Sequence, residues 1–160
     1  CSDFEGDPES FYYKADAFIR EAKKRDMKRP KIRLALIGVP PIFDDLFEYL
    51  EERGAAVVFN EVPRQFSMPN NCNGITEQYL KYTYPYHVKW RIEDIKQQCA
   101  LRNVDGVIHY SQSFCFRQIE DILFRKNLDL PFFSLEGDQP ITLDARTRLR
   151  LETFLNIIGG

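Results

Sequence analysis

The feature that most constrains the fold is an alternation between short apolar runs and longer amphipathic segments. Residues 32–37 form a mostly apolar run that Gly38 ends, and residues 44–53 then carry apolar side chains at helical spacing. A short run of this kind is typical of a strand buried on both faces of a parallel sheet. Residues 107–136 repeat the plan of strand, loop, helix and strand, which matches the size of a βαβ unit.

This alternation predicts an α/β fold, with helices on both faces of a parallel sheet. The expected strands are residues 32–37, 56–59, 107–110 and 131–135. The expected helices are residues 44–53, 85–103, 117–126 and 144–158, with a loop at 63–74. Because crossovers between parallel strands are right-handed, the favoured order is 2-1-3-4, in a flavodoxin-like three-layer domain. In the first of these helices, Leu46, Phe47 and Leu50 are expected to face inward.

Residues 1–30 are expected to form a helix and a linker. Asp7 can cap a helix that Pro8 begins, and apolar side chains such as Phe18 then recur at helical spacing. The chain begins without an initiator Met, so we expect this helix to follow an upstream domain. Residues 31–160 are expected to form the flavodoxin-like domain.

Composition and charge argue against several classes of protein. The 160 residues include 22 Lys and Arg against 24 Asp and Glu, so the chain lacks the basic surface that nucleic acid binding needs. The longest mostly apolar stretch, residues 34–43, is too short to cross a bilayer. With four scattered cysteines and no secretion signal, we expect free thiols and a cytoplasmic location. The sequence also lacks the glycine motifs of nucleotide sites and the GxSxG motif of hydrolases.

The predicted sheet also indicates where a ligand would bind. Ligands of such sheets bind beyond the carboxyl ends of the strands, where the strand order reverses. Here that point lies between the loops at residues 38–41 and 111–115. The candidate pocket residues are Gly38, Pro40, Gln112, Ser113 and Phe114.

Cys115 is the most informative of the four thiols. It follows the third predicted strand and precedes the helix expected from Arg117, and a thiol at a helix N-terminus is favoured as thiolate. A thiolate is both a nucleophile and a metal ligand. The alternative is a small buried residue packed beneath Phe114 and Phe116.

The other cysteines and histidines are weaker candidates. Cys99 lies on the apolar side of its predicted helix and is expected in the core, whereas Cys72 lies in an Asn-rich loop. His109 lies within a predicted strand, which favours a hydrogen-bonded core histidine over a catalytic base. His87, at a helix start, suits either a pocket rim or a packing role.

An ordered series of segments resembles one enzyme family. The segments are GAAVV (54–58), RQFSMP (64–69), RIEDI (91–95), VDGVIHY (104–110), FC (114–115), LPFFSLEGD (130–138) and RTRLRLETF (146–154). Over about residues 31–158, the series resembles the C-terminal half of 2-hydroxyacyl-CoA dehydratase and benzoyl-CoA reductase subunits of the D-component type.

This resemblance implies an iron–sulfur site. Subunits of the family have two flavodoxin-like domains facing each other across a cleft, with a [4Fe–4S] cluster held between them by cysteines of both. The cysteine that follows the DGVI strand is one ligand and matches Cys115, while the others belong to the upstream domain. Three-cysteine ligation leaves one iron open to a substrate. Residues 1–160 alone are therefore expected to lack both cluster and activity.

The resemblance also implies a reaction and partners. The substrate is a CoA thioester, a homologous second subunit is present, and an iron–sulfur activator protein uses ATP to deliver one low-potential electron. The dehydratases expel a hydroxyl through a ketyl radical anion, and the reductases reduce an aromatic ring. Two alternatives stay open, a non-catalytic flavodoxin-like binding or scaffold module and a cytosolic enzyme with Cys115 as nucleophile.

Overall fold

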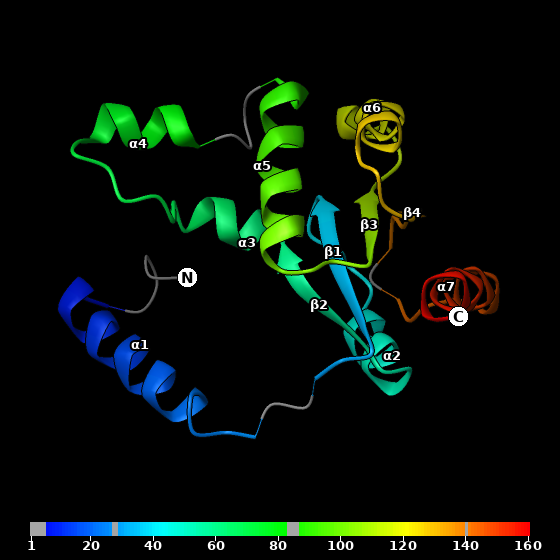
Figure 1. The fold of residues 1–160 in the computed structure, drawn as a ribbon, viewed down its shortest axis with the longest axis horizontal. Helices are drawn as coiled ribbons and strands as arrows, with labels where there is room; N and C mark the ends of the chain where they lie inside the picture. Colours follow the sequence, from blue (N-terminus) through cyan, green and yellow to red (C-terminus); the bar gives the residue numbers. More distant parts are fainter. Residues whose placement is uncertain (1–5, 27–28, 83–86, 140) are drawn as a thin grey trace.

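A parallel sheet forms the centre of the computed structural model, which describes residues 6–26, 29–82, 87–139 and 141–160. Its strands are β1 (Ile32–Gly38), β2 (Ala55–Asn60), β3 (Gly106–Ser111) and β4 (Phe132–Glu136) (Figure 1). All neighbouring strands are parallel, and their order is β2-β1-β3-β4. The predicted α/β class and flavodoxin-like order are confirmed, and every predicted strand end lies within one residue of the observed end.

Two pairs of helices cover the two faces of this sheet. They are α2 (Leu46–Glu52) with α7 (Ala145–Gly159) on one face, and α5 (Val88–Leu101) with α6 (Glu120–Asn127) on the other (Figure 1). Successive strand residues point to opposite faces. Leu36 therefore joins the core beneath α2 and α7, while the neighbouring Ala35 and Ile37 join the core beneath α5 and α6.

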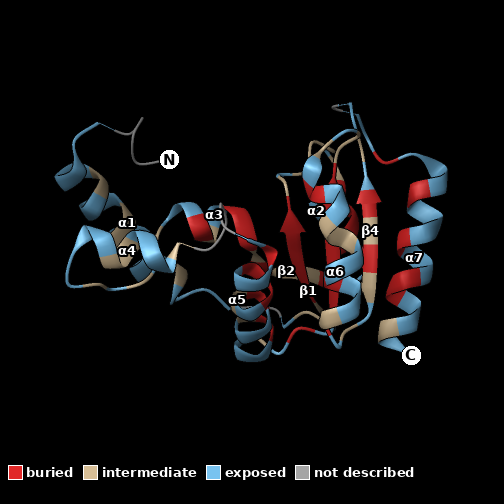
Figure 2. Ribbon diagram, turned by 90° about the horizontal axis from the view of Figure 1, so that it is seen from above, coloured by how far each residue is buried: buried red, intermediate tan, exposed pale blue. Residues whose placement is uncertain are grey.

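The two central strands are buried along almost their whole length, and Figure 2 shows that the strands of the sheet carry many of the buried residues. Leu34, Leu36 and Ile108 are at most 1% exposed. Fully burying such a side chain contributes about 1.5–3 kcal/mol. The continuous apolar runs in the sequence thus have their physical explanation, because both faces of β1 and β3 are covered by helices.

Helix α2, which connects β1 to β2, is shorter than the predicted helix at residues 44–53, and one of its inward-facing residues differs from the prediction. Phe47, expected to face inward, is 43% exposed, whereas Tyr49 is 3% exposed. Leu46 and Leu50 are buried as predicted. Tyr49 takes the third inward position because its ring packs in the core while its hydroxyl donates to the carbonyl oxygen of Arg148 at 2.9 Å.

Two further helices lie in the connection between β2 and α5. They are α3 (Glu61–Phe66) and α4 (Ile75–Lys81). The prediction of a loop over residues 63–74 was wrong at residues 63–66, which belong to α3. Pro63 is compatible with α3 because it lies in the first turn, where backbone N–H groups have no partner within the helix.

The N-terminal helix α1 (Pro8–Ala22) is confirmed, with Asp7 as its cap. The Asp7 side chain accepts a hydrogen bond from the N–H of Ser10 at 2.9 Å. The helix has no buried residue, and Phe18 is 61% exposed. Figure 1 shows α1 apart from the sheet, so its apolar stripe does not contribute to the core. No helix in the described ranges combines the length and apolar character needed to cross a bilayer.

Candidate functional site

The carboxyl ends of β1 and β3 lie side by side at the centre of the sheet. Gly38 is the register partner of Tyr110, and the N–H of Val39 donates to the carbonyl oxygen of Tyr110 at 3.1 Å. From this point β1 connects toward β2 and β3 toward β4, on opposite sides. The strand order therefore reverses here, and the predicted loops at residues 38–41 and 111–115 start as neighbours.

Backbone geometry requires glycine at position 38. Gly38 has a φ of +103°, a region that side chains rarely tolerate. A Cβ atom there would lie 2.1 Å from the carbonyl oxygen of Tyr110 and 2.8 Å from Cδ2 of His109. Gly38 thus permits the close approach of the two strands, and nearby Pro40 is exposed on the loop.

Cys115 is a free, half-buried thiol at the end of the loop after β3. Its N–H donates to the carbonyl oxygen of Gln112 at 3.0 Å, and its carbonyl oxygen accepts from the N–H of Gln118 at 3.0 Å. The packing alternative needs the flanking rings to cover the thiol, yet Phe114 is fully exposed and Phe116 is 69% exposed. The geometry therefore favours an accessible thiol over a packed one.

The helix after Cys115 starts later than the sequence predicts. A 3-10 turn, η2 (Phe116–Ile119), separates Cys115 from Glu120, the first residue of α6. The prediction of a helix from Arg117 onward is therefore only partly correct, because the α-helix begins at Glu120. Cys115 therefore does not directly precede an α-helix, as the predicted arrangement had it.

Phe114 combines a rare backbone conformation with an exposed apolar ring. Its φ is +61°, which is unusual for a bulky side chain, and its ring is completely exposed. Residues in sparsely populated backbone regions cluster at binding and catalytic sites. Phe114 offers an apolar contact directly beside Cys115.

Ser113 ties the Cys115 loop to the end of β4. Its N–H donates to Oδ1 of Asp138 at 2.6 Å, and its hydroxyl lies 2.9 Å from Oε1 of Glu136 and also contacts Asp138. A hydroxyl has one proton and serves one of these carboxylates at a time. The hydrogen bonds from Ser113 lower the pKa of Asp138. Gln118 adds a second link by donating to Oε2 of Glu136 at 3.2 Å.

His109 is a core histidine, as the sequence predicts, but only one of its nitrogens is paired. The residue is 1% exposed, and its Nδ1 lies 2.8 Å from Oδ1 of Asp121. Burial lowers the pKa of His109 and outweighs the opposite effect of Asp121. The neutral ring therefore donates from Nδ1 to Asp121. Its Nε2 has no hydrogen-bond partner in the part of the chain that the structure describes.

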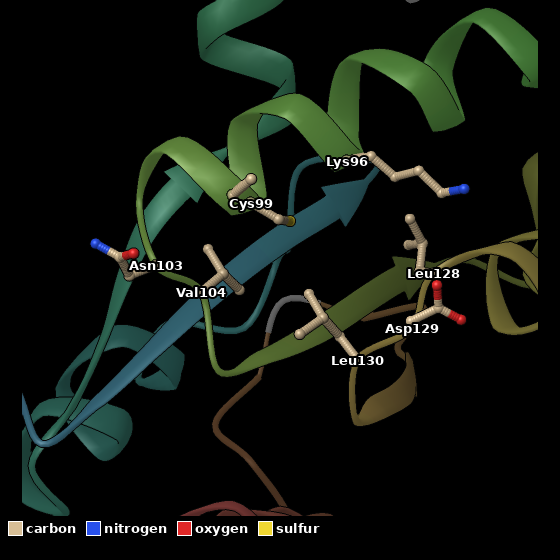
Figure 3. A pocket seen from close by; sticks show the side chains of 8 residues that line it. Lys96, Cys99, Asn103, Val104, Leu128, Asp129 and Leu130 are labelled. Atoms are coloured by element: carbon tan, nitrogen blue, oxygen red, sulfur yellow. The ribbon is translucent and has the colours of Figure 1, made fainter.

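A cavity of about 350 Å³ lies at the opposite end of the strands, next to the residues that precede β3 and β4 (Figure 3). Val104, Leu128 and Leu130 line it, and the sulfur of Cys99 points into it. Burial raises the pKa of Cys99 to about 11, so this thiol stays protonated at neutral pH and is a poor nucleophile. Cys99 is the packed cysteine that the sequence predicts.

His87 and Cys72 belong to other segments of the chain than the two loops of the carboxyl edge. His87 caps α5, and its Nδ1 accepts from the N–H of Lys89 at 3.2 Å. Residues 84–86, which suggested a pocket rim beside it, lie outside the described residues. Cys72 is a half-buried thiol whose Sγ lies 3.4 Å from the carbonyl oxygen of Asn70.

Sequence reasoning missed a charged cluster beneath the edge. Glu61 and Arg91 are 1% and 0% exposed, and they pair through two hydrogen bonds of 2.8 and 2.7 Å. A signal was present, because Arg91 falls three residues after Val88 and four before Ile95, on the buried side of the helix. A charged residue in that register predicts a buried ion pair.

The described residues can supply part of a metal site. They contain no group of three or more His, Cys, Asp or Glu side chains that could hold a metal ion. Cys115 offers an accessible thiol, and thiolates are the usual ligands of iron–sulfur clusters. Within the described ranges, what this edge offers to a cluster is therefore a single thiol.

The fold and this edge define a parallel α/β domain with a thiol where such sheets bind ligands. A family model, described as 2-hydroxyglutaryl-CoA dehydratase, D-component, matches residues 1–158. The chain belongs to this family, as the resemblance predicted. The match extends over residues 1–30, beyond the segments that carried the resemblance. A comparison with curated proteins gives no match.

Family membership gives the class of the protein. It is a subunit of a 2-hydroxyacyl-CoA dehydratase-type enzyme, which is a lyase. The family is generally associated with iron–sulfur clusters, and the D-component implies a partner subunit and an activator in general terms.

Proposed function

We propose that this chain supplies Cys115 as one thiolate ligand of a [4Fe–4S] cluster in a 2-hydroxyacyl-CoA dehydratase. The observation that carries the proposal is the position of the thiol. Cys115 is a free, half-buried thiol in the loop that leaves the reversal point of a parallel sheet, in a chain of a family associated with iron–sulfur clusters. The reducing cytoplasm, where thiols stay free, is the compartment that this proposal requires.

The remaining ligands, on this proposal, come from a further domain that faces the carboxyl edge. Residues 31–160 are then one flavodoxin-like domain, and residues 1–30 connect it to the other domain. The unburied faces of α1 support this division, because a helix with Phe18 and Ile19 exposed has apolar surface left to pack elsewhere. The chain without that domain would hold no cluster and have no activity.

The residues around Cys115 would form the wall of the substrate site. A bound cluster would supply a low-potential electron for removing a hydroxyl from a CoA thioester. The side-chain amide of Gln112 can donate to the carbonyl oxygen of the thioester, Phe114 can keep water away, and Ser113 holds the loop in place through its bonds at the end of β4. The loop from Gly38 to Pro40 closes the opposite side.

The partners follow from the same proposal. A homologous second subunit assembles with this one, and an ATP-dependent iron–sulfur activator delivers the electron. Reduction of an aromatic ring, as in benzoyl-CoA reductases, uses related subunits. The match to the dehydratase D-component favours dehydration.

Anaerobic iron and sulfide reconstitution of the protein, assembled with its partner subunit, tests the ligand assignment. We expect Cys115→Ser to lose iron or to change the electron paramagnetic resonance spectrum. Cys72→Ser is the matched control, because Cys72 is also half-buried but lies in the loop between α3 and α4. Unchanged iron content together with an unchanged spectrum in Cys115→Ser would end the assignment.

A further inference from the structure

Beneath the carboxyl edge, on the α5/α6 face, four charged side chains form one connected network. Both Nε and Nη2 of Arg91 donate to the carboxylate of Glu61, at 2.8 and 2.7 Å. The Nη1 of Arg91 donates to Oε2 of Glu120, and the Nη1 of Arg117 lies 3.4 Å from that same oxygen. Two cations and two anions balance, which burial of charge requires.

This network reaches both loops of the candidate site. At one end, Oε2 of Glu61 accepts from the backbone N–H of Gly38 at 3.0 Å, where β1 passes into its loop. At the other end, Glu120 and Arg117 lie in α6 and η2, directly after Cys115. Arg91, from α5, joins the two ends.

The chemistry of Arg91 suits this bridging role. A guanidinium is planar and has five donors in a fixed fork, so it holds two carboxylates in a defined relative geometry. Its plane lies over the ring of Phe124, with Cζ 5.0 Å from the ring centroid. An ammonium group is a point charge on a flexible stem and cannot hold the same pair of directions.

Stability alone does not explain such a network. Replacing a buried ion pair with well-packed apolar side chains is often neutral or stabilising, so the charges are weak evidence for a stability role. What a network of directional bonds adds is a fixed position for the segments that it joins.

We propose that Arg91 is a positioning residue of the candidate site. Through Glu61 it fixes the Gly38 loop, and through Glu120 it fixes the η2 segment that follows Cys115. The proposal rests on the proposed function for the importance of Cys115. The positioning itself depends only on the contacts of this chain.

The test measures the reactivity of Cys115 in the iron-free protein. Iodoacetamide labelling is followed by peptide mass spectrometry, so Cys115 and Cys72 are timed in the same sample. Freeing the segment after Cys115 should expose the half-buried thiol, and we expect Arg91→Lys to raise its labelling rate about tenfold. The labelling rate of Cys72 should not change.

Arg64→Lys is the matched control for Arg91→Lys. Arg64 pairs with Asp94 at 2.7 Å and also joins α3 to α5, but this pair involves neither β1 nor α6. We expect it to leave Cys115 labelling unchanged. Leu155→Ala, made in the core on the opposite face, gives a variant of lowered melting temperature without touching the network.

If Arg91→Lys does not fold, Glu120→Gln is the variant that tests the positioning role of the network. It keeps the shape of the side chain and removes one charge, and we expect Cys115 labelling to rise about threefold or more. A smaller rise in folded protein overturns the proposal. An equal rise in Leu155→Ala at the same loss of melting temperature also overturns it, because general loosening then explains the effect.

A spectroscopic readout separates this proposal from the proposed function. In the reconstituted assembly, Arg91→Lys should keep the iron but alter the line shape of the electron paramagnetic resonance spectrum, and Arg64→Lys should not alter it. If Cys115→Ser leaves iron binding intact, the ligand proposal fails while the iron-free labelling still decides the role of Arg91. An unaltered line shape in Arg91→Lys, with Cys115 confirmed as ligand, overturns the positioning role.

Discussion

The core beneath α2 and α7 is held by apolar side chains, whereas the core beneath α5 and α6 buries charged ones. On the first face, Leu50, Leu151 and Leu155 pack against β1 and β3. On the second face the buried polar residues are Glu61, Gln65, Arg91, His109 and Arg117. Apolar contacts have no direction, while hydrogen-bonded charges do. Both faces bury apolar side chains, and the comparison indicates that the second face adds directional contacts that fix the position of the candidate site.

Breaking the charged face should give the largest loss of stability. Arg91→Met leaves Glu61 buried without its cation, and we expect the free energy of unfolding to fall by about 3–5 kcal/mol. Adding Glu61→Gln should recover most of this loss, because the amide oxygen can still accept from the N–H of Gly38. Urea unfolding followed by circular dichroism measures both variants. A double variant as unstable as Arg91→Met alone would contradict this account.

Breaking the apolar face should lower stability without disturbing the site. Leu155→Ala removes a core side chain that is 4% exposed, and we expect a loss of about 3 kcal/mol in urea unfolding. Leu155→Met, which conserves volume, is the control and should cost about 1 kcal/mol. The labelling rate of Cys115 should be the same in both. A rate that follows the loss of stability would show that the two faces are not independent.

The charged face should also respond to pH through His109. Burial holds the pKa of His109 below its ordinary value of 6.5. As the pH falls, His109 therefore binds a proton in the unfolded chain before it does so in the folded chain. The free energy of unfolding should therefore fall as the pH drops below about 6.5. In His109→Gln this part of the fall should disappear, whereas the exposed His87→Gln should retain it. Urea unfolding at pH 7.5, 6.5 and 5.5 makes the comparison, and a pH dependence retained in full in His109→Gln would exclude His109 as its source.

The smallest expected effects compare a packed helix with an unpacked one. Asp144 caps α7 by accepting from the N–H of Thr147 at 2.6 Å, as Asp7 caps α1. Asp144→Ala should cost about 1 kcal/mol of global stability. Asp7→Ala should lower helix content but leave the global transition in place, because α1 has no buried residue. Equal shifts of the urea midpoint would show that α1 is coupled to the core.

The sheet could be predicted from the sequence because strands that are buried on both faces contain runs of consecutive apolar residues. The runs at β1 and β3 are apolar at nearly every position, and handedness then limits their order. Phe47 was misplaced because helical spacing alone does not distinguish neighbouring positions at the margin of an apolar face. Tyr49 takes the inward position by pairing its hydroxyl with the backbone of α7.

The candidate site was predictable in place and only partly in its contacts. The reversal point and Cys115 follow from strand order and chain position, which are local or topological facts. The link from Gly38 through Glu61 and Arg91 to Glu120 joins residues far apart in the sequence. The periodicity of apolar residues does not predict such pairings, since they depend on how α3, α5 and α6 pack against one another. The register of Arg91 on its helix indicated burial but gave no partner.

The register of β1 has a consequence for how the domain is made. On one side β1 pairs with β2, where Ile32 faces Ala55, but on the other side Leu34 faces Gly106, 72 positions later. During synthesis, therefore, β1 emerges with one edge unpaired and stays so until β3 has left the ribosome. Long-range parallel pairing of this kind forms slowly. Until it forms, the backbone N–H and C=O groups on that edge of β1 are left unpaired. The growing polypeptide would need a chaperone, or rapid translation of the intervening segment, to keep that edge from pairing with a neighbouring chain.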